Sequence, residues 1–310
     1  MRIVICEFMD GAAVASLATR FDVTYDPRLV DRRDVLRQTL ADADGCIVRN
    51  RTQVDAELLD SAPLLKVVGR LGVGLDNIAV DLCAARGIEV IPATGANASA
   101  VAEYVLGTAI LLLRPAFRAT EEVAAGRWPR ERWSDGREIG GKTLGLIGFG
   151  GIGRMTARLA RAVGMQVIAF DAQVPETAEV WGDEKVAPHA LDYVLANADV
   201  VSLHVPLTAG TRNLVNAERL AKMKCGAVLI NTARGGVLDE AAVAAALSAG
   251  ALGGAALDVF ADEPLTAGST LAECPNLILT PHIAGVTRES NARVSMLIAD
   301  RVAAHFATGR

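Results

Sequence analysis

The chain has 310 residues, of which 51% are hydrophobic, 4% aromatic and 22% charged, and its formal net charge is −5. This length allows two domains, each large enough to bury a core of its own. The scarcity of aromatic residues and the negative net charge, with no basic stripe along the chain, argue against a nucleic acid partner.

Export and membrane insertion are also disfavoured. The N-terminal apolar run 3–6 ends at Glu7 and is too short for a signal peptide. The most apolar helical stretch, 105–113, is far shorter than the roughly 20 residues that cross a bilayer. The five cysteines are scattered without a C-x-x-C pair, which favours reduced thiols over a zinc site or a disulfide framework. We therefore expect a cytoplasmic protein with no membrane partner and no bound metal.

The first third of the chain, residues 1 to about 92, alternates short apolar strands with helical patterns. This alternation predicts a parallel sheet covered by helices on both faces. The strands are expected near Ile3, near Val23, and at 46–48, 67–68 and 88–91.

Two helical patterns are expected to connect the domains. One runs from Asn97 to about Ala125, and a loop that contains Trp128 and Trp133 follows it. The other starts at Thr287, just after the last expected strand, and extends to about residue 307. We expect the first to be the hinge and the second to return to the first domain.

The segment from Lys142 to Asp171, KTLGLIGFGGIGRMTARLARAVGMQVIAFD, predicts a dinucleotide-binding unit of strand, glycine turn, helix and second strand. Gly148, Gly150 and Gly153 have the G-x-G-x-x-G spacing, which allows a tight turn, a close approach of the backbone to a pyrophosphate, and close packing of helix on strand. The helix N-terminus favours the anion. Asp171 stands close to the spacing of about 20 residues expected for the acid that bonds the adenine ribose. Its carboxylate would repel a 2′-phosphate, which favours NAD over NADP.

Further strands are expected at 200–203, 227–231, 254–257 and 277–279. Ligands of an open parallel sheet bind beyond the carboxyl ends of its strands. The candidates for chemistry are therefore the polar residues that follow these strands: His204, Arg234, Asp258, Glu263 and His282.

Three of these candidates suit hydride transfer between a hydroxy acid and a nicotinamide. Arg234 offers a planar fork for the substrate carboxylate, and His282 can exchange a proton near neutral pH. Glu263, bonded to that imidazole, would favour its protonated form. Taken singly, each also has a structural interpretation, as a loop histidine, a turn-capping arginine and a turn acid, and only their joint placement indicates catalysis. His189 and His305 have no such setting and are given no role.

Five segments closely resemble the NAD-dependent D-isomer-specific 2-hydroxyacid dehydrogenases, particularly the phosphoglycerate dehydrogenase branch. They cover nearly the whole chain in the family's order and are VVGRLGVGLDNI (67–78), GLIGFGGIG (145–153), INTARGGVLDE (230–240), ALDVFADEP (256–264) and PHIAG (281–285). The resemblance implies an α/β fold of two doubly wound parallel-sheet domains. One is a flavodoxin-like substrate domain, residues 1–96 and 286–310, and the other a Rossmann NAD-binding domain, residues 97–285. It also implies a homodimer built largely on the nucleotide domain.

The same resemblance implies roles for individual residues. Arg234 would bind substrate, His282 would be the acid/base with Glu263 as its partner, and Asp258 would hold the nicotinamide carboxamide. At Val205, where that branch commonly has threonine, only a backbone contact to the cofactor carries over. The full set of expected cofactor-lining positions is Gly148, Gly150, Gly151, Ile152, Gly153, Asp171, Val205, Pro206, Thr232, Ala233, Asp258, His282, Ala284 and Gly285.

A glycine-flanked turn in the first domain is a candidate site for the substrate carboxylate. Gly72, Val73 and Gly74 follow a strand, and glycines there allow successive N–H groups to form an anion-binding nest, although a simple tight turn fits the spacing as well. The resemblance implies that this nest receives the carboxylate together with Arg234.

Three arginines predict a second anionic group on the substrate. Arg49 and Arg51 stand at i and i+2 after an expected strand, which places them on the same side, and Arg70 stands at the end of another. Arginine forks suit phosphate, sulfonate and carboxylate groups. The candidate substrates are therefore 3-phosphoglycerate, sulfolactate and malate-like acids.

Two other functions remain open. Relatives of this fold act as transcriptional corepressors that sense nicotinamide cofactors, and they can retain the dehydrogenase residues. The compact ending at Arg310 and the lack of long flanks favour an enzyme, one without the C-terminal regulatory domain of longer phosphoglycerate dehydrogenases. A phosphite dehydrogenase of the same family is the second alternative. A formate dehydrogenase is disfavoured, since formate enzymes have Gln where Glu263 stands.

Overall fold

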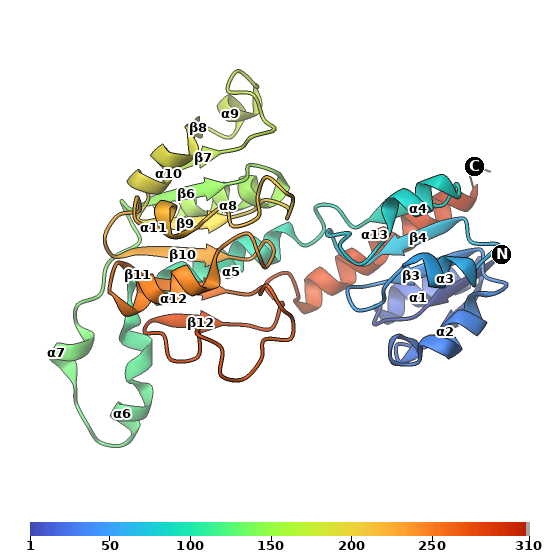
Figure 1. Cartoon of the computed structure of the whole chain (residues 1–310), viewed down its shortest axis with the longest axis horizontal. Coiled ribbons are helices and arrows are strands. Elements are labelled where there is room, and N and C mark those ends of the chain that lie inside the picture. Colours follow the sequence, from blue (N-terminus) through green and yellow to red (C-terminus); the bar gives the residue numbers. More distant parts are fainter. Residues whose placement is uncertain (308–310) are drawn as a thin grey trace. The chain divides into compact units, whose positions relative to one another are not determined.

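The computed structural model of the chain describes residues 1–307 and comprises two compact units (Figure 1). The first unit holds Met1–Asn97 and the chain from Val286 onward, and the second holds Ala98–Gly285. The boundary that the sequence suggested after residue 96 lies one residue before the observed one. Residues 308–310, which end the expected C-terminal segment of the first domain, lie outside the described residues.

The first unit is built on a parallel sheet of five strands in the order β2-β1-β3-β4-β5. Neighbouring strands pair in register along this order, as the alternation of strands and helices in the sequence predicts. The strands are β1 Arg2–Ile5, β2 Asp22–Tyr25, β3 Gly45–Val48, β4 Val67–Arg70 and β5 Glu89–Pro92.

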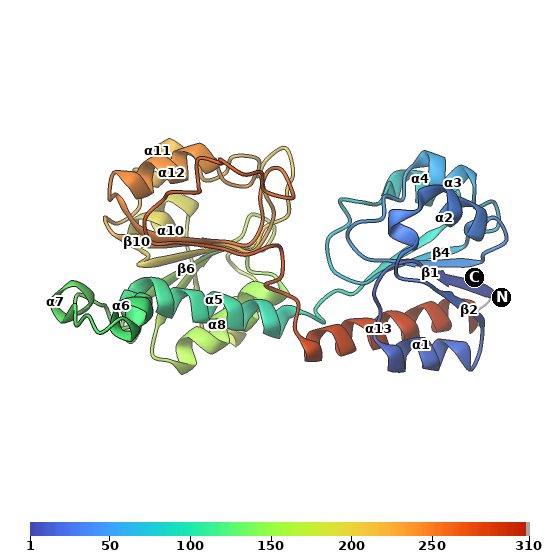
Figure 2. The same cartoon turned by 90° about the horizontal axis from the view of Figure 1, so that it is seen from below.

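Helices cover both faces of this sheet (Figure 2). Ile3, Ile5 and Ile47 pack against one pair of helices, while Val4 and Cys46 pack against the opposite layer, because successive strand residues point to opposite faces. The first layer is α1 Gly11–Ala18 and α13 Arg288–Ala307, and the second is η1 Leu29–Asp31, α2 Arg33–Leu40, α3 Ala56–Asp60 and α4 Val80–Ala85.

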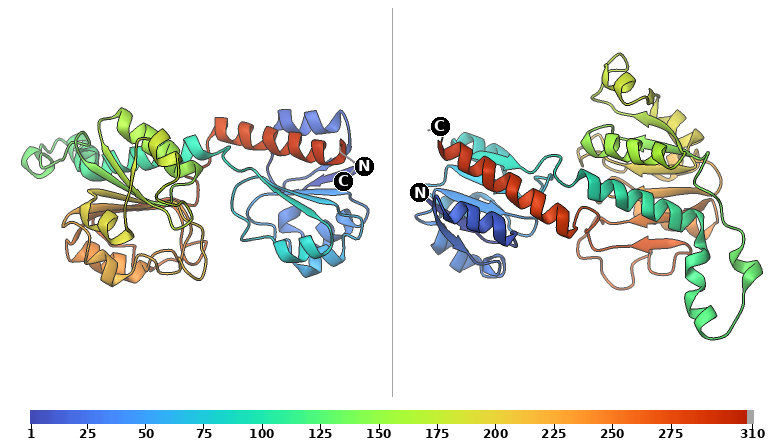
Figure 3. Two further views of the ribbon diagram at one scale, coloured as in Figure 1. Left: turned by 90° about the horizontal axis from the view of Figure 1, so that it is seen from above. Right: turned by 180° about the vertical axis from the view of Figure 1, so that it is seen from behind.

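The returning helix α13 packs directly on the sheet beside α1 (Figure 3). A Cβ at Gly69 of β4 would lie 2.8 Å from Ile298 and 3.0 Å from Val302, so glycine is needed at that crossing. At the start of α1, Asp10 caps the helix by accepting the Ala12 N–H at 3.0 Å, and its own N–H donates to Ser295 of α13 at 3.0 Å. The C-terminal helix therefore belongs to the core of the first unit.

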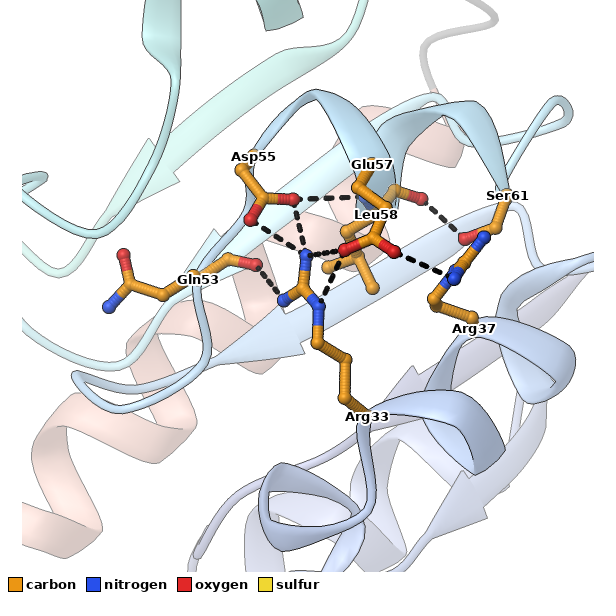
Figure 4. A network of polar contacts seen from close by, with 7 residues as sticks. All are labelled: Arg33, Arg37, Gln53, Asp55, Glu57, Leu58 and Ser61. Atoms are coloured by element: carbon orange, nitrogen blue, oxygen red, sulfur yellow. Dashed lines mark hydrogen bonds and ion pairs between the residues drawn. The ribbon is translucent and has the colours of Figure 1, made fainter.

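An ion-pair network ties α2 to α3 at the surface (Figure 4). Arg33 donates to both carboxylate oxygens of Asp55, at 2.5 and 2.7 Å, and to Glu57 at 3.1 Å, and Arg37 also reaches Glu57, at 2.8 Å. Asp55 caps α3 by accepting the Leu58 N–H at 3.0 Å. Partial burial acts to raise the pKa of Asp55, but the Leu58 N–H and the Arg33 guanidinium hold it below its usual value. The cap is therefore charged at neutral pH.

The second unit is built on a parallel sheet of seven strands in the order β12-β11-β10-β9-β6-β7-β8. The direction in which strands are added reverses between β6 and β9, and ligands of such sheets bind beyond the carboxyl ends of the strands at this switch point. The strands are β6 Thr143–Ile147, β7 Gln166–Phe170, β8 Ala187–Pro188, β9 Val200–Leu203, β10 Ala227–Asn231, β11 Leu252–Leu257 and β12 Leu277–Leu279.

Helices also cover both faces of the larger sheet, and each face has its own buried apolar cluster. On one face α5 Ala98–Leu113 and α8 Gly151–Ala162 lie side by side (Figures 2 and 3). The opposite face carries α10 Leu191–Asn197, α11 Ala217–Leu220 and α12 Glu240–Ser248, and the short helix α9 Val180–Asp183 precedes β8. The prediction of two doubly wound parallel-sheet domains is confirmed.

The single long helix expected from Asn97 to about Ala125 is wrong. The helix α5 ends at Leu113, and the chain bends by 70° into η2 Pro115–Ala119 and α6 Thr120–Ala124. Pro115 explains the break, because it has no N–H to donate and disfavours helical backbone in the residue before it. A further short helix, α7 Arg130–Trp133, lies where a loop was expected. Residues 115–133 form an arm that projects from the second unit (Figure 1).

In the described part of the chain no single helix is both long and apolar enough to cross a membrane. The bent pair formed by α5 and the segment Pro115–Ala124 meets the criterion together, on length and composition alone.

Candidate active site

The glycine turn lies at the switch point, between β6 and α8. Gly148 has a φ of 101°, and a Cβ there would lie 2.5 Å from the carbonyl oxygen of His204, so only glycine fits. A Cβ at Gly153 would clash with the carbonyl oxygen of Gly148, which explains how α8 starts so close to the turn. Phe149, between the glycines, is buried and stacks on Trp181 at 4.4 Å between ring centroids. The stacking of Phe149 on Trp181 therefore fixes the position of the turn.

The same turn has the features of a pyrophosphate site. No protein atom lies within 4 Å of a Cβ built at Gly150 or Gly151, so space is open along this stretch of backbone. The first N–H groups of α8, which begins at Gly151, have no partner within their own helix and favour an anion. These observations fit the diphosphate of a dinucleotide.

Asp171 follows β7 and is bonded to the glycine turn. Its Oδ2 accepts the Phe149 N–H at 2.6 Å and its Oδ1 accepts the Gln173 N–H at 2.7 Å. A carboxylate has about four acceptor positions, so these two bonds leave room for two hydroxyl groups. Asp171 is thus held rigidly and can still bind a ribose, as an NAD site requires.

His204 lies beneath the turn, with part of its surface exposed. Its imidazole Nε2 is 3.0 Å from the Ser202 hydroxyl, and burial lowers the pKa of His204 to about 4. The ring is therefore neutral at physiological pH and packs under Gly148 and Gly153. The sequence marks His204 as a strand-end candidate, and the structure shows that it supports the glycine turn.

The turn after β10 is shaped by Asn231, which the sequence did not single out. Its buried side chain accepts the Ala233 N–H at 3.0 Å and donates to the Arg234 carbonyl at 3.0 Å. Thr232 carries a buried hydroxyl without a hydrogen-bond partner in the described structure. A buried polar atom of this kind is costly unless a ligand or water pairs with it, so Thr232 also fits a cofactor site. Asn231 was recognisable only as the one polar residue in an otherwise apolar strand.

Arg234 stands on a turn that packs against the loop carrying Glu263. One guanidinium nitrogen of Arg234 donates to the Ala233 carbonyl at 2.6 Å. A Cβ at Gly235 would clash with the carbonyl oxygen of Phe260, so the two backbones are in direct contact. Glu240, the first residue of α12, strengthens the junction by accepting the Ala261 N–H at 2.6 Å. The arginine turn and the glutamate loop are therefore fixed relative to each other.

Glu263 and His282 form a hydrogen-bonded pair. Glu263 Oε2 is 2.8 Å from His282 Nδ1, and Oε1 accepts the Phe260 N–H at 3.1 Å. Both side chains are 36% exposed. Because the carboxylate engages Nδ1, the remaining ring nitrogen, Nε2, is the one that can meet a substrate.

Asp258 is almost fully buried, with 1% of its surface exposed. Its carboxylate accepts the Ile283 N–H and the Ala284 N–H, each at 2.8 Å, and its backbone carbonyl accepts the His282 N–H at 2.8 Å. Asp258 therefore organises the segment 282–285. The contact to the nicotinamide that the resemblance implies stays a prediction beside this structural role.

In the first unit, a buried acid holds the loop that carries two of the candidate arginines. Glu7 is 4% exposed and accepts the N–H groups of Arg49, Arg51 and Thr52 at 2.7, 3.2 and 3.0 Å. The side chain of Arg49 donates to Asn291 of α13 at 2.9 Å, whereas that of Arg51 pairs with Asp31 of η1. The two side chains reach different elements, so the expected placement on one side is wrong. Strand β3 ends at Val48, so the alternation of side chains does not extend to Arg49 and Arg51. Beyond Val48, the hydrogen bonds to Glu7 set the course of the backbone.

Arg70, at the end of β4, is 8% exposed and folds back over the turn that follows. A Cβ at Gly72 would clash with the Arg70 guanidinium. The φ of Gly72 is outside the left-handed region, so glycine is needed there for this contact and not for a special backbone conformation. Val73 is 37% exposed at the tip of the turn. Whether the Gly72–Gly74 amides bind an anion stays a prediction.

Within residues 1–307, no group of three or more His, Cys, Asp or Glu side chains is arranged to hold a metal ion.

Comparison with known proteins identifies the family. The model for the NAD binding domain of D-isomer specific 2-hydroxyacid dehydrogenases matches residues 106–284. The chain belongs to this family. The resemblance seen in the sequence is thereby confirmed, and the protein is an NAD-dependent oxidoreductase.

Individual relatives align over most of the chain. An (S)-sulfolactate dehydrogenase of Chromohalobacter salexigens is 54% identical over 97% of this chain and 96% of its own length. A hydroxypyruvate reductase of Thermotoga maritima is 40% identical over 87% of both chains. Among solved structures, the TT0316 protein of Thermus thermophilus superposes with a TM-score of 0.87 at 33% identity, over 99% of this chain and 97% of its own.

The environment of His204 predicts a pH dependence of stability. In the unfolded chain a histidine has a pKa of about 6.5, so on acidification the unfolded state binds the proton first and stability falls as the pH drops from about 6.5 towards 4. Between pH 7 and pH 5 the wild type should lose about 2 kcal/mol more unfolding free energy than His204→Gln. Denaturant unfolding at both pH values measures this, with His189→Gln as the matched control for loss of a histidine. Equal pH dependence in wild type and His204→Gln would contradict it.

Proposed function

We propose that the protein interconverts a 2-hydroxy acid and its 2-oxo acid, with Arg234, Glu263 and His282 as the catalytic residues. The observation that carries this proposal is the 2.8 Å bond between Glu263 and His282, on a loop locked against the arginine turn. The carboxylate fixes the orientation of the ring through Nδ1, and the arginine turn provides a cation for the substrate carboxylate.

In oxidation, His282 Nε2 takes the hydroxyl proton of the substrate while Arg234 holds its carboxylate. The bound nicotinamide supplies the acceptor for the C2 hydride, or the donor in the reverse direction. In reduction, the protonated His282 returns the proton, and the positive charge of Arg234 polarises the substrate carbonyl. Glu263 keeps Nδ1 engaged throughout, which fixes the orientation of the ring.

For NAD itself, we propose three contacts beside the glycine turn. Asp171 would bind the adenine ribose through its unused acceptor positions, and Thr232 would bind the cofactor through its buried hydroxyl. Asp258 would bind the nicotinamide carboxamide. The remaining contacts would come from the positions Val205, Pro206, Ala233, Ala284 and Gly285.

The acid/base assignment predicts distinct effects for two substitutions. His282→Asn should lower kcat at least about 10²-fold, the usual loss for a general acid/base, while NADH binding measured by fluorescence persists. Glu263→Gln should lower kcat less than His282→Asn does, because the amide keeps a contact to Nδ1 but loses the charge-assisted hydrogen bond that orients the ring. Steady-state rates across a pH series measure both. Near-normal turnover in His282→Asn would refute the assignment.

We further propose that the substrate carries a second anionic group and that sulfolactate is the first candidate. The (S)-sulfolactate dehydrogenase relative supports this, as does the arginine content of the first unit. Arg70 is the strongest candidate for a contact, since its guanidinium lies against Gly72 in the candidate carboxylate-binding turn. Phosphoglycerate and malate-like acids remain the alternatives.

A substrate panel tests this second anion. For the wild type, kcat/KM for sulfolactate should exceed that for lactate, and Arg70→Lys should reduce this ratio at least about tenfold because a lysine loses the bidentate fork. Arg49→Ala and Arg51→Ala locate any further contact, and circular dichroism checks folding of each variant. If the ratio is the same in the wild type and all three variants, these arginines do not bind a second anionic group of the substrate.

We propose a homodimer formed through the arm. Three apolar side chains of the arm are strongly exposed: Phe117 at 60%, Val123 at 45% and Trp128 at 79%. Exposed apolar surface of this kind is typical of subunit interfaces. We retain the expectations of a cytoplasmic location and of no nucleic acid or membrane partner on the grounds of composition alone.

The dimer proposal predicts that charges on the arm dissociate the protein. Phe117→Asp combined with Trp128→Asp should yield monomers, because burying two new carboxylates at an interface is unfavourable. Sedimentation velocity gives the molecular mass. Leu64→Asp, at a 53% exposed leucine in the first unit, is the matched control and should leave the mass unchanged. A dimer that persists in the double variant would place the interface elsewhere.

Neither alternative function gains support from these observations. None of the relatives reported above is named as a corepressor or a phosphite dehydrogenase. Glu263 stands where formate enzymes have glutamine, and here it bonds the histidine directly.

A further inference from the structure

Asp258 forms several of the hydrogen bonds that hold the segment carrying His282. Three of its neighbours donate to the Asp258 carboxylate: the Thr280 hydroxyl at 2.6 Å, and the N–H groups of Ile283 and Ala284 at 2.8 Å. The Asp258 carbonyl accepts the N–H of His282 itself. Asp258 therefore bonds a residue before His282, His282 itself and two residues after it. We call these four hydrogen bonds the bracket.

This bracket matters because His282 has an unfavourable backbone conformation. Its φ is 57°, in the left-handed region, which a residue with a Cβ adopts only at an energetic cost. Surrounding contacts must hold such a conformation. If the bracket loosens, His282 can relax to ordinary backbone angles, and its imidazole then leaves Glu263.

The single proton of the Thr280 hydroxyl links the bracket to helix α5, which lies outside the strand-end loops. The Thr280 hydroxyl has a single proton, which it gives to Asp258. The hydroxyl of Tyr104 lies 2.7 Å from the same Thr280 oxygen, so Tyr104 must be the donor in that bond. Burial raises the pKa of Tyr104, and the charge of Asp258 adds to this against the opposing effect of Thr280, so the phenol keeps its proton. The chain of donors runs from Tyr104 of α5 through Thr280 to Asp258.

We propose that Tyr104 and Thr280 are positioning residues for His282: their hydroxyls fix the Asp258 carboxylate, and through it the backbone that aims the imidazole at Glu263. The proposal rests on the function of His282 proposed above. Neither hydroxyl touches the ring. Thr280 donates to the buried Asp258 carboxylate, and Tyr104 orients the Thr280 hydroxyl. Together they keep the carboxylate aligned with the Ile283 and Ala284 N–H groups.

The chain offers a closely matched control. Thr280→Val removes the hydroxyl and keeps the shape, Tyr104→Phe removes only the outer donor, and Thr280→Ser restores a hydroxyl. Thr108→Val makes the same chemical change in α5. Thr108 is 6% exposed, and its hydroxyl donates to the Tyr104 backbone carbonyl at 2.8 Å. It controls for a general loss of stability, since it lies outside the bracket.

Turnover and a spectroscopic signal are measured together. Misplacing a catalytic group by about 1 Å can cost up to about 10²-fold, so Thr280→Val should lower kcat at least about tenfold and Tyr104→Phe severalfold. Thr280→Ser and Thr108→Val should stay within about twofold of the wild type. In ¹⁵N-histidine spectra, the ring signals of His282, assigned by their loss in His282→Asn, should change in Thr280→Val and not in Thr108→Val.

Two results would overturn the proposal: a fall in kcat for Thr280→Val no larger than for Thr108→Val, or unchanged His282 ring signals in Thr280→Val. Failure of the proposed function is distinguishable, because it would appear as normal turnover in His282→Asn. If His282→Asn is inactive while Thr280→Val behaves like the wild type, the acid/base role stands and the positioning role falls.

Discussion

Direct backbone contact between neighbouring loops is the constraint on which the site of the second unit depends. Gly148 lies against the carbonyl of His204, Gly153 against that of Gly148, and Gly235 against that of Phe260. At the first and third of these contacts, loops that follow adjacent strands of the sheet hold each other at fixed spacing, and the second holds the start of α8 against its own turn. A single added methyl group at any of these contacts would have to move backbone, which is far stiffer than a side chain. The glycines therefore explain how residues from separate loops keep a defined geometry.

Carboxylates complete this arrangement in the same way in both units. Glu7, Asp171, Asp258 and Glu263 each accept backbone N–H groups of a loop at a strand end. Loops of this kind have no sheet or helix partner for their amides, and an acceptor-only group satisfies several of them at once. Buried acids near the strand ends are thus required for loop conformation whether or not they meet a ligand. Asp258, which bonds backbone N–H groups and one hydroxyl, is buried, while Glu263, which also bonds the imidazole of His282, stays partly exposed.

The sequence predicted the features that depend on local chemistry and missed those that depend on distant partners. The parallel strands follow from apolar runs, and the glycine turn follows from the spacing of Gly148 to Gly153, because both are local patterns. Tyr104 could not be found in this way, since it reaches Thr280 from a helix 176 positions away in sequence. The same holds for Arg49 and Arg51, whose directions are set by the buried Glu7 and not by strand alternation. Position after a strand end identifies a candidate, but tertiary contacts decide where its side chain points.

Two histidines at the ends of strands in one sheet show how far environment outweighs position. His204 follows β9 and His282 follows β12, and the sequence marks both as candidates. Under the glycine turn, His204 loses water without gaining a charged partner, so its pKa falls and it remains neutral. His282 keeps contact with solvent, and its Nδ1 bonds the Glu263 carboxylate. Because its charged form is disfavoured, His204 is poorly suited to hold a proton near neutral pH. The proposal that His282 is the acid/base therefore rests on burial and on one hydrogen bond, which are the two properties that a strand-end position leaves undetermined.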